Sequence, residues 1–188
     1  LLEHIIQRDA AGTVRMLKKG VTTLAIPREF PIKSRSDWED HYKWRLKYDS
    51  DRLGEGWLSR YHELREDGLP VRMAATGLYR FPRDLMGDVG LCLAYYTQPD
   101  LVHDMLQTYV DMICAVSEQL LSKIDVDSFH MGEDMCYRNT MMISPGTFRE
   151  FMMPHYLRII ELYRAHGTSI FSIDTDGNLT TLIPLLIE

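Results

Sequence analysis

From residue 70 onward, short apolar segments of strand length alternate with longer amphipathic segments of helix length. Strands are predicted at 70–77, 125–131 and 168–173, with helical patterns between them and after the last one. This alternation predicts parallel strands joined by helical crossovers, because parallel neighbours need a long connection that returns along the sheet. The strand segments are brief apolar runs, which is typical of strands covered on both faces. The sequence therefore predicts an α/β fold.

The boundaries of two long helices are marked by side chains that favour helix ends. Thr97 is predicted to cap a helix that runs to about residue 124, and Ser144 with Pro145 is predicted to open another. Pro154 interrupts the second helix, and Gly167 ends it because glycine readily adopts the left-handed conformation of a helix C-terminus. These signals place the crossovers on either side of the central strand.

The first 70 residues have a different pattern. Residues 1–30 alternate apolar and polar side chains around glycines, which predicts a hairpin-like segment with a turn at Lys19-Gly20. Ser36 and Glu39 form a capping box, so a helix is predicted from Ser36 to about residue 48. A second helical pattern spans about 52–66, and the segment after residue 77, with Pro82 and Gly87, is predicted to be a loop.

Composition excludes several classes of protein. The chain has 188 residues, 45% hydrophobic and 26% charged, which fits a single globular domain with a real core. Its net charge of -6 argues against a nucleic-acid partner, which would need clustered lysine and arginine. We find no apolar run of membrane-spanning length, no signal peptide, and three widely spaced cysteines, so we expect a cytoplasmic protein with reduced thiols.

Acidic and basic side chains gather where the predicted strands end. The strand ends are Thr76-Gly77, the segment 130–134 with His130, Glu133 and Asp134, and the segment 174–178 with Asp174 and Asp176. Because ligands of parallel α/β folds bind beyond the carboxyl ends of the strands, these side chains are candidates for a functional site. The alternative for Asp174 and Asp176 is turn and helix-cap chemistry, in which aspartate is also favoured.

Four stretches carry a resemblance to a known family: GEDM at 132–135, ISPGTFREFMMPHY at 143–156, ELYRAHG at 161–167 and DTDGNLTTLIPLLIE at 174–188. From about residue 70 the chain resembles the uroporphyrinogen decarboxylase superfamily. The resemblance implies a TIM-type (β/α)8 barrel, of which this chain would hold about three strands. We therefore expect an incomplete barrel, a single domain that is a piece of a longer protein, and a hairpin-like extension at 1–30.

The resemblance implies an enzyme of one of two kinds. The superfamily contains uroporphyrinogen decarboxylases and zinc-dependent methyltransferases that act on corrinoid-bound or thiol-bound methyl groups. The ISP…HG stretch favours a methyltransferase-like role, with a methyl donor and a corrinoid protein as expected partners. The alternatives are decarboxylation of uroporphyrinogen or a related tetrapyrrole, and a non-catalytic module that binds a corrinoid or porphyrin.

Two departures from the family pattern bear on these alternatives. The methyltransferases have His-x-Cys-Gly where this chain has Asp174-Thr175-Asp176-Gly177. Soft zinc ligands are thus replaced by carboxylates, so the resemblance implies a divalent metal at Asp174 and Asp176 that prefers oxygen ligands. The decarboxylases position the tetrapyrrole with a tyrosine where this chain has Asp84, with Tyr79 nearby.

Roles follow for the candidate residues. Carboxylates at the strand ends suit acid–base catalysis, and arginines at the mouth of a fold suit substrate carboxylates. The predicted catalytic residues are Asp174, Glu133 and Asp84, and the predicted substrate-binding residues are Arg80, Arg83, Tyr79 and His130. A buried, hydrogen-bonded role is the alternative for His130, and a solvated loop is the alternative for the arginines. An incomplete barrel would expose strand edges, so a homo-oligomer is also expected.

Overall fold

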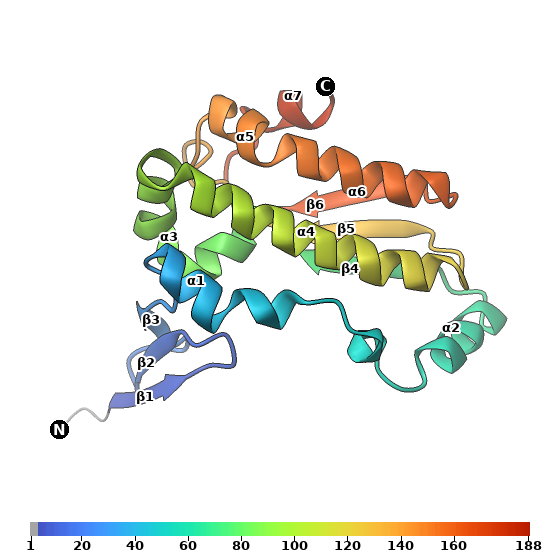
Figure 1. The fold of residues 1–188 in the computed structure, drawn as a ribbon, viewed down its shortest axis with the longest axis horizontal. Helices are drawn as coiled ribbons and strands as arrows, with labels where there is room; N and C mark the ends of the chain where they lie inside the picture. Colours follow the sequence, from blue (N-terminus) through green and yellow to red (C-terminus); the bar gives the residue numbers. More distant parts are fainter. Residues whose placement is uncertain (1–3) are drawn as a thin grey trace.

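The computed structural model describes residues 4–188 and shows two small sheets connected by helices (Figure 1). The strands are β1 (His4–Arg8), β2 (Val14–Lys18), β3 (Ile26–Glu29), β4 (Arg72–Thr76), β5 (Ser128–Gly132) and β6 (Ile170–Asp174). The helices are α1 (Arg35–His41), α2 (Trp57–Glu66), α3 (Arg80–Thr97), α4 (Pro99–Leu121), α5 (Pro145–Phe151), α6 (Met153–Ala165) and α7 (Ile183–Leu186). Two short 3-10 turns, Lys43–Leu46 and Ser50–Leu53, connect α1 to α2.

Strands β4, β5 and β6 form a parallel sheet in that order, which confirms the parallel strands predicted from the alternation. Thr76, Gly132 and Asp174 stand side by side in the register at its carboxyl end. Helices α3 and α4 connect β4 to β5, and α5 and α6 connect β5 to β6. The three strand ends therefore lie along one edge of the sheet.

The predicted TIM-type barrel, and with it the incomplete barrel, is wrong. Residues 4–188 contain one sheet of three antiparallel strands and one sheet of three parallel strands, and neither closes into a barrel. Alternating strands and helices specify parallel neighbours, but closure also requires about eight strands with a matched tilt and stagger. The alternation alone could not distinguish an open three-stranded sheet from part of a barrel wall.

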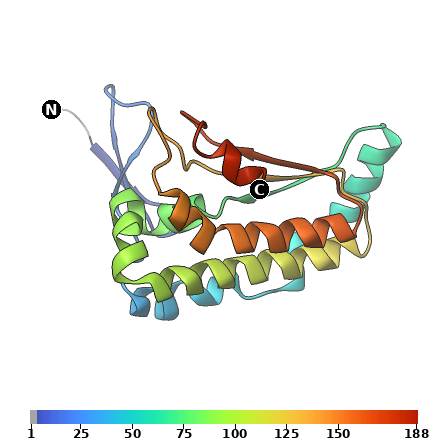
Figure 2. The same ribbon diagram turned by 90° about the horizontal axis from the view of Figure 1, so that it is seen from above.

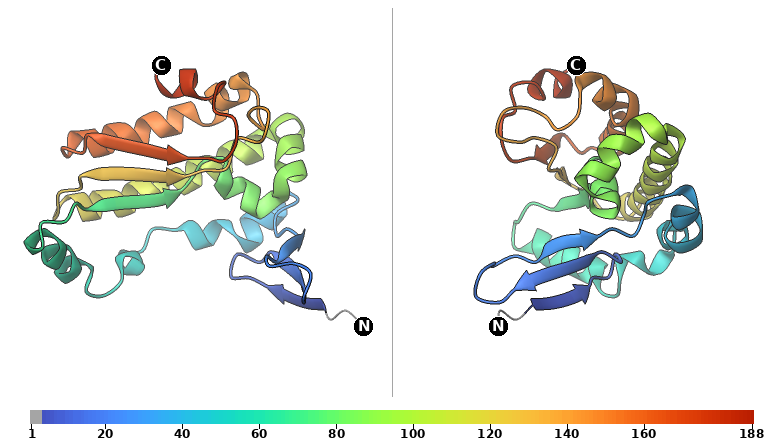
Figure 3. Two further views of the ribbon diagram at one scale, coloured as in Figure 1. Left: turned by 180° about the vertical axis from the view of Figure 1, so that it is seen from behind. Right: turned by 90° about the vertical axis from the view of Figure 1, so that its left-hand side faces the viewer.

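Only one face of the parallel sheet is covered by helices, as Figure 2 shows. Side chains on the covered face, such as Phe129 and Met131, are buried, while β4 and β6 alternate between exposed and partly buried positions. The other face carries His130, Ser172 and Asp174 and is open in the left-hand view of Figure 3. The expectation that both faces are covered is thus wrong, because five-residue strands read as apolar runs even though their polar side chains alternate.

The core lies between the sheet and helices α3, α4 and α6. Helix α4 has an apolar stripe that is buried at Leu101, Val102, Met105 and Leu106 and continues to Leu120. Each fully buried side chain of this size contributes about 1.5–3 kcal/mol relative to exposure. Among residues 4–188, no helix is both long and apolar enough to cross a membrane.

Several predicted helix ends are confirmed and others shift. Ser144 accepts a hydrogen bond from the Thr147 backbone N–H at 3.0 Å and opens α5, as predicted. In α1 the cap is Ser34 rather than Ser36. The predicted loop after residue 77 is instead helix α3, because Pro82 lies in its first turn, where proline is tolerated. Gly87 interrupts α3 with a positive φ, and the Phe30 ring occupies the space that a side chain at Gly87 would need.

The N-terminal sheet pairs in the order β1-β2-β3, so the predicted hairpin-like segment is confirmed over the part of 1–30 that the structure describes, with residues 1–3 lying outside it. Its turn at Lys19-Gly20 has Gly20 in the left-handed region. The sheet joins the rest of the molecule through Thr13, which is fully buried and donates to the Asp84 carbonyl at 3.2 Å. The sheet projects from the helical layer in the right-hand view of Figure 3.

Candidate functional site at the strand ends

The open face of the sheet brings charged groups together around Gly132. A side-chain carbon added to Gly132 would lie 3.8 Å from Asp174 Oδ1 and 4.0 Å from Arg80 Nη1. His130 lies two residues earlier on the same face, with its Nε2 3.9 Å from Asp174 Oδ2. We call Arg80, His130, Gly132 and Asp174 the strand-end cluster. It combines a cation, an imidazole and a carboxylate around Gly132, which has no side chain.

One carboxylate oxygen of Asp174 is hydrogen-bonded to the backbone, while most of the side chain is exposed. Its Oδ1 accepts the Glu133 backbone N–H at 2.8 Å, which fixes the carboxylate against the end of β5. Its side chain is nevertheless 64% exposed, so solvent or a ligand reaches the other oxygen. The predicted catalytic residue therefore lies where a substrate could touch it.

His130 is oriented by a neighbour on β6. Its Nδ1 lies 2.9 Å from Ser172 Oγ, across the sheet in register. Because the Ser172 hydroxyl rotates freely, it can accept from or donate to the ring, so either tautomer is supported. Nε2 is left facing Asp174. The pair places a ring nitrogen and a carboxylate oxygen where both can contact a bound molecule.

The two predicted arginines differ in how they are held. Arg83 donates to Asp134 Oδ2 at 2.8 Å and lies within 3.4 Å of Asp84 Oδ1, and its side chain is only 19% exposed. Burial lowers the pKa of Arg83, but its hydrogen bond to Asp134 and the nearby carboxylates outweigh this and raise it. Arg80 is 43% exposed, and its ion pairs within residues 4–188 are long, at 3.6 Å to Asp84 and 3.9 Å to Asp134. Arg80 is thus the arginine available to an anionic ligand.

Asp84 and Tyr79 lie beside the cluster rather than over Gly132. Asp84, like Asp134, is an ion-pair partner of both Arg80 and Arg83. The Tyr79 side chain is fully buried, and its hydroxyl lies 3.6 Å from Met142 Sδ. Burial raises the pKa of Tyr79 far above its ordinary value. The roles that the sequence suggested for these two residues stay predictions.

Glu133 follows β5 but its side chain turns under the sheet edge. The residue is 1% exposed, and its carboxylate accepts the backbone N–H groups of Tyr79 at 3.1 Å and Arg80 at 3.0 Å, together with the Tyr156 hydroxyl. Burial raises the pKa of Glu133 to about 7, against these hydrogen bonds, which lower it. Sequence reasoning found Glu133 but not Tyr156, which comes from α6, because a helical tyrosine gives no local signal of a carboxylate partner.

The segment after Asp174 forms a tight turn. Gly177 has a φ of +91°, and a side-chain carbon there would lie 2.3 Å from the Tyr137 carbonyl oxygen. Asn178 donates its backbone N–H to that carbonyl and accepts the Thr180 N–H, both at 2.9 Å. The turn alternative considered from the sequence thus accounts for Gly177 and Asn178, while Asp176 lies exposed at the start of this turn.

The predicted divalent metal would need several ligands close together at the strand ends. Within residues 4–188, no three His, Cys, Asp or Glu side chains are grouped so that they could hold a metal ion together. Asp174 Oδ1 already accepts the Glu133 N–H. The donor set around Asp174 and Asp176 therefore does not fit a metal held by this part of the chain alone, and metal binding stays a prediction.

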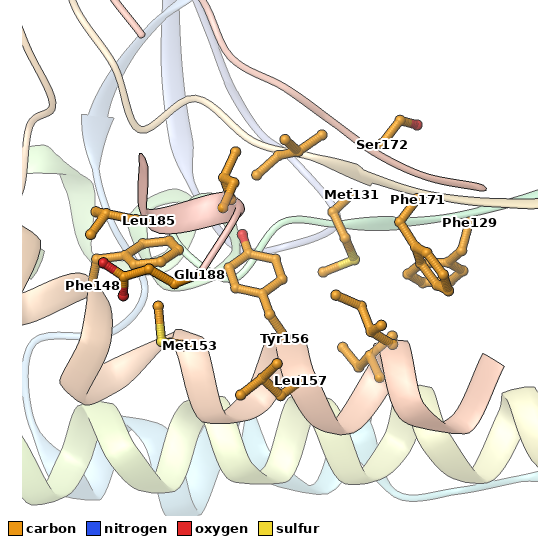
Figure 4. A pocket seen from close by; sticks show the side chains of 14 residues that line it. Phe129, Met131, Phe148, Met153, Tyr156, Leu157, Phe171, Ser172, Leu185 and Glu188 are labelled. Carbon is orange, nitrogen blue, oxygen red and sulfur yellow. The ribbon is translucent and has the colours of Figure 1, made fainter. Parts of the chain in front are cut away.

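A separate apolar cavity of about 340 Å³ lies on the helix side of the sheet, beside β6 (Figure 4). Side chains from β5, β6, α5, α6 and α7 line it, among them Met131, Phe148, Tyr156, Phe171 and Leu185. Sequence reasoning missed this cavity, because its walls come from five elements that are individually ordinary apolar segments. It is separated from the strand-end cluster by the sheet, since Met131 and Phe171 point to the opposite face from His130 and Asp174.

Comparison of the chain with protein-family models, with curated proteins and with solved structures finds no match. The resemblance to the uroporphyrinogen decarboxylase superfamily therefore rests on the sequence stretches alone and carries over only as a proposal.

Proposed function

We propose that this chain belongs to an enzyme that transfers a proton to or from a substrate carrying carboxylates, at the strand-end cluster. The observation that supports the proposal is the meeting of Arg80, His130 and Asp174 around Gly132 on an uncovered face. A guanidinium is suited to binding carboxylates, and an imidazole beside a carboxylate is suited to acid–base catalysis near neutral pH.

Decarboxylation, the alternative that the resemblance left open, makes the fullest use of these groups. In that reaction the carbon–carbon bond to the leaving carboxylate breaks, carbon dioxide departs, and the electron pair stays on the substrate carbon. A protonated His130 gives its Nε2 proton to that carbon, and Asp174 stabilises the imidazolium before transfer. Solvent then restores the proton to His130.

Arg80 is proposed to bind a substrate carboxylate that does not leave. Pairing a guanidinium with the leaving carboxylate would stabilise the ground state and slow the reaction, whereas a remote carboxylate supplies binding without that cost. A substrate with several carboxylates, such as a tetrapyrrole, meets this requirement. Gly132 leaves room for the substrate between Arg80 and Asp174.

Methyl transfer is supported less by this geometry. The strand-end cluster contains no thiolate, and the methyl-transfer chemistry implied by the resemblance depends on a metal with soft ligands. We therefore place decarboxylation first and derive no step through a metal.

The proposal is tested by turnover. Uroporphyrinogen is incubated with the wild-type protein, with Asp174→Asn and with His130→Gln, and carbon dioxide and the less carboxylated product are measured. Asp174→Asn keeps an acceptor for the Glu133 N–H, so it should fold while losing most turnover, by about 10²-fold or more. Turnover that is unchanged in both variants would refute the assignment of these residues.

The expected surroundings of the protein also remain proposals. A cytoplasmic location is supported by Cys92, Cys114 and Cys136, all of which are free thiols. A homo-oligomer is supported by the uncovered face of the sheet and by the exposed side chain of Ile170 on its edge strand.

A further inference from the structure

Glu133 is a buried carboxylate that the proposed reaction does not use directly. With 1% of its surface exposed, it does not reach the open face where a substrate would lie. Burying a carboxylate is costly unless hydrogen bonds compensate it. The arrangement of those compensating bonds indicates what the residue does.

The side chain of Glu133 caps the N-terminus of α3. The first N–H groups of a helix lack partners within the helix, and Tyr79, at the cap position, supplies no side-chain hydrogen bond. Glu133 reaches across from β5 and accepts the N–H groups of Tyr79 and Arg80. The approach requires Gly77, because a side-chain carbon there would lie 1.9 Å from Glu133 Cδ.

The backbone of Glu133 holds Asp174, which lies across Gly132 from Arg80. Its N–H donates to Asp174 Oδ1 at 2.8 Å and lies 3.2 Å from the Asp174 carbonyl oxygen. One residue therefore fixes the main chain that carries Arg80 and also the carboxylate of Asp174. These are the two groups that face each other over Gly132.

We propose that Glu133 is a positioning residue that sets the placement of Arg80 relative to Asp174 across Gly132. The hydrogen bonds that hold Arg80 and Asp174 do not depend on the proposed function, whereas the effect of Glu133 on catalysis does. Glu133 acts through Arg80 and Asp174 and does not contact the substrate, in place of the direct catalytic role that the sequence suggested.

The groups packed around the Glu133 carboxylate keep it apart from the open face. Tyr79 and Tyr95 from the start and interior of α3, Tyr109 from α4 and Tyr156 from α6 surround it, and burial raises the pKa of all four hydroxyls. These tyrosines are therefore neutral near pH 7, and Arg80 contributes its backbone N–H. Glu133 is the member of this buried group whose charge changes near neutral pH.

The test uses Glu133→Gln, which keeps the size of the side chain and removes its charge, with Tyr156→Phe as the matched control. Tyr156→Phe removes a hydrogen bond to the same carboxylate but leaves the bonds to α3 and to Asp174. The first readout is the ring ¹⁵N chemical shift of His130, whose Nε2 lies 3.9 Å from Asp174. The second is the dissociation constant for uroporphyrin, used as a probe with several carboxylates.

We expect Glu133→Gln to move the His130 ring signals and to weaken uroporphyrin binding about tenfold or more, while Tyr156→Phe leaves both near the wild-type values. In an Asp174→Asn background, the effect of Glu133→Gln on the His130 signals should disappear, because the effect passes through Asp174. Glu133→Asp should not restore the wild-type signals, because its side chain is one carbon too short to reach α3.

Two results would overturn the inference. A loss of stability in urea for Glu133→Gln with unchanged His130 signals would show that Glu133 is a helix cap only. Equal effects of Glu133→Gln and Tyr156→Phe on His130 would likewise overturn the inference, because they would show that the side-chain bonds to α3 do not set the position of Asp174. The His130 signals are measured without any ligand, so a wild-type protein that binds no uroporphyrin would count against the proposed function and not against this inference.

Discussion

The two faces of the parallel sheet use neighbouring residues of the same strands for opposite purposes. On β5, Phe129 and Met131 are buried against the helices, while His130 between them faces the open side. On β6, Phe171 and Ile173 line the apolar cavity, while Asp174 reaches the strand-end cluster. One face therefore supplies stability and the other carries the proposed chemistry, because side chains one residue apart along a strand point to opposite faces.

The largest expected effect tests the covered face. Phe129→Ala should lower the free energy of unfolding by about 3–5 kcal/mol, because the ring is buried and packs 4.2 Å from the Tyr163 ring. Ser128→Ala on the open face should change it by no more than about 0.5 kcal/mol. Urea unfolding of the two variants measures both values, and equal losses would show that the two faces are not divided in this way.

The second effect is the pH dependence that Glu133 imposes. Its pKa is about 7 in the folded protein and near 4.5 when unfolded, so between these values the folded state binds more protons. Stability therefore falls as pH rises from about 4.5 to about 7, by roughly 3 kcal/mol. Glu133→Gln should remove this fall, as measured by urea unfolding across the window.

Other titrating groups do not mimic this effect. Asp104 and Asp127 have pKa values lowered below 3.8, by their hydrogen bonds to Lys43 and to the Val71 backbone among others, so their contribution is lost only at more acidic pH. Burial lowers the pKa of His155, so its contribution to stability increases as pH rises. This contribution is the same in the wild type and in Glu133→Gln. The same slope in wild type and Glu133→Gln would show that Glu133 is ionised throughout the window.

A smaller expected effect is a difference in stability between alanine substitutions at two glycines of the same sheet edge. Gly77→Ala should cost about 1–3 kcal/mol, because its side chain would overlap the Glu133 carboxylate. Gly132→Ala should change stability by no more than about 0.5 kcal/mol, because its nearest neighbours lie at ordinary contact distances of 3.8 Å and more. Thermal or urea unfolding distinguishes them, and a large loss in Gly132→Ala would contradict the open space over Gly132.

The sequence predicted the parallel strands because capping signals at Ser144 and Gly167 mark where helices begin and end. It did not predict α3, because Pro82 and Gly87 are usually helix breakers. Here Pro82 falls in the first turn and Gly87 bends the helix against Phe30. The barrel was wrong because closure depends on the number and tilt of strands, which local patterns do not encode.

Only part of the candidate site was predicted, because local sequence patterns do not give the direction of every side chain. The rule that ligands bind at the carboxyl ends of parallel strands placed Arg80, His130 and Asp174 in one region. It could not place Glu133, because the direction of a side chain just past a strand depends on the turn that follows. The role of Gly132 also required the structure, since a glycine marks open space only when its neighbours are known.

The central claim is that Arg80 in the strand-end cluster binds a carboxylate of the substrate. The most direct measurement is the dissociation constant of uroporphyrin for the wild type, for Arg80→Ala and for Arg60→Ala, an exposed arginine on α2 that pairs with Glu63. We predict saturable binding that Arg80→Ala weakens about 10- to 100-fold and Arg60→Ala leaves unchanged, as expected for a lost charge-assisted hydrogen bond. Equal affinity of the wild type and Arg80→Ala would contradict the account.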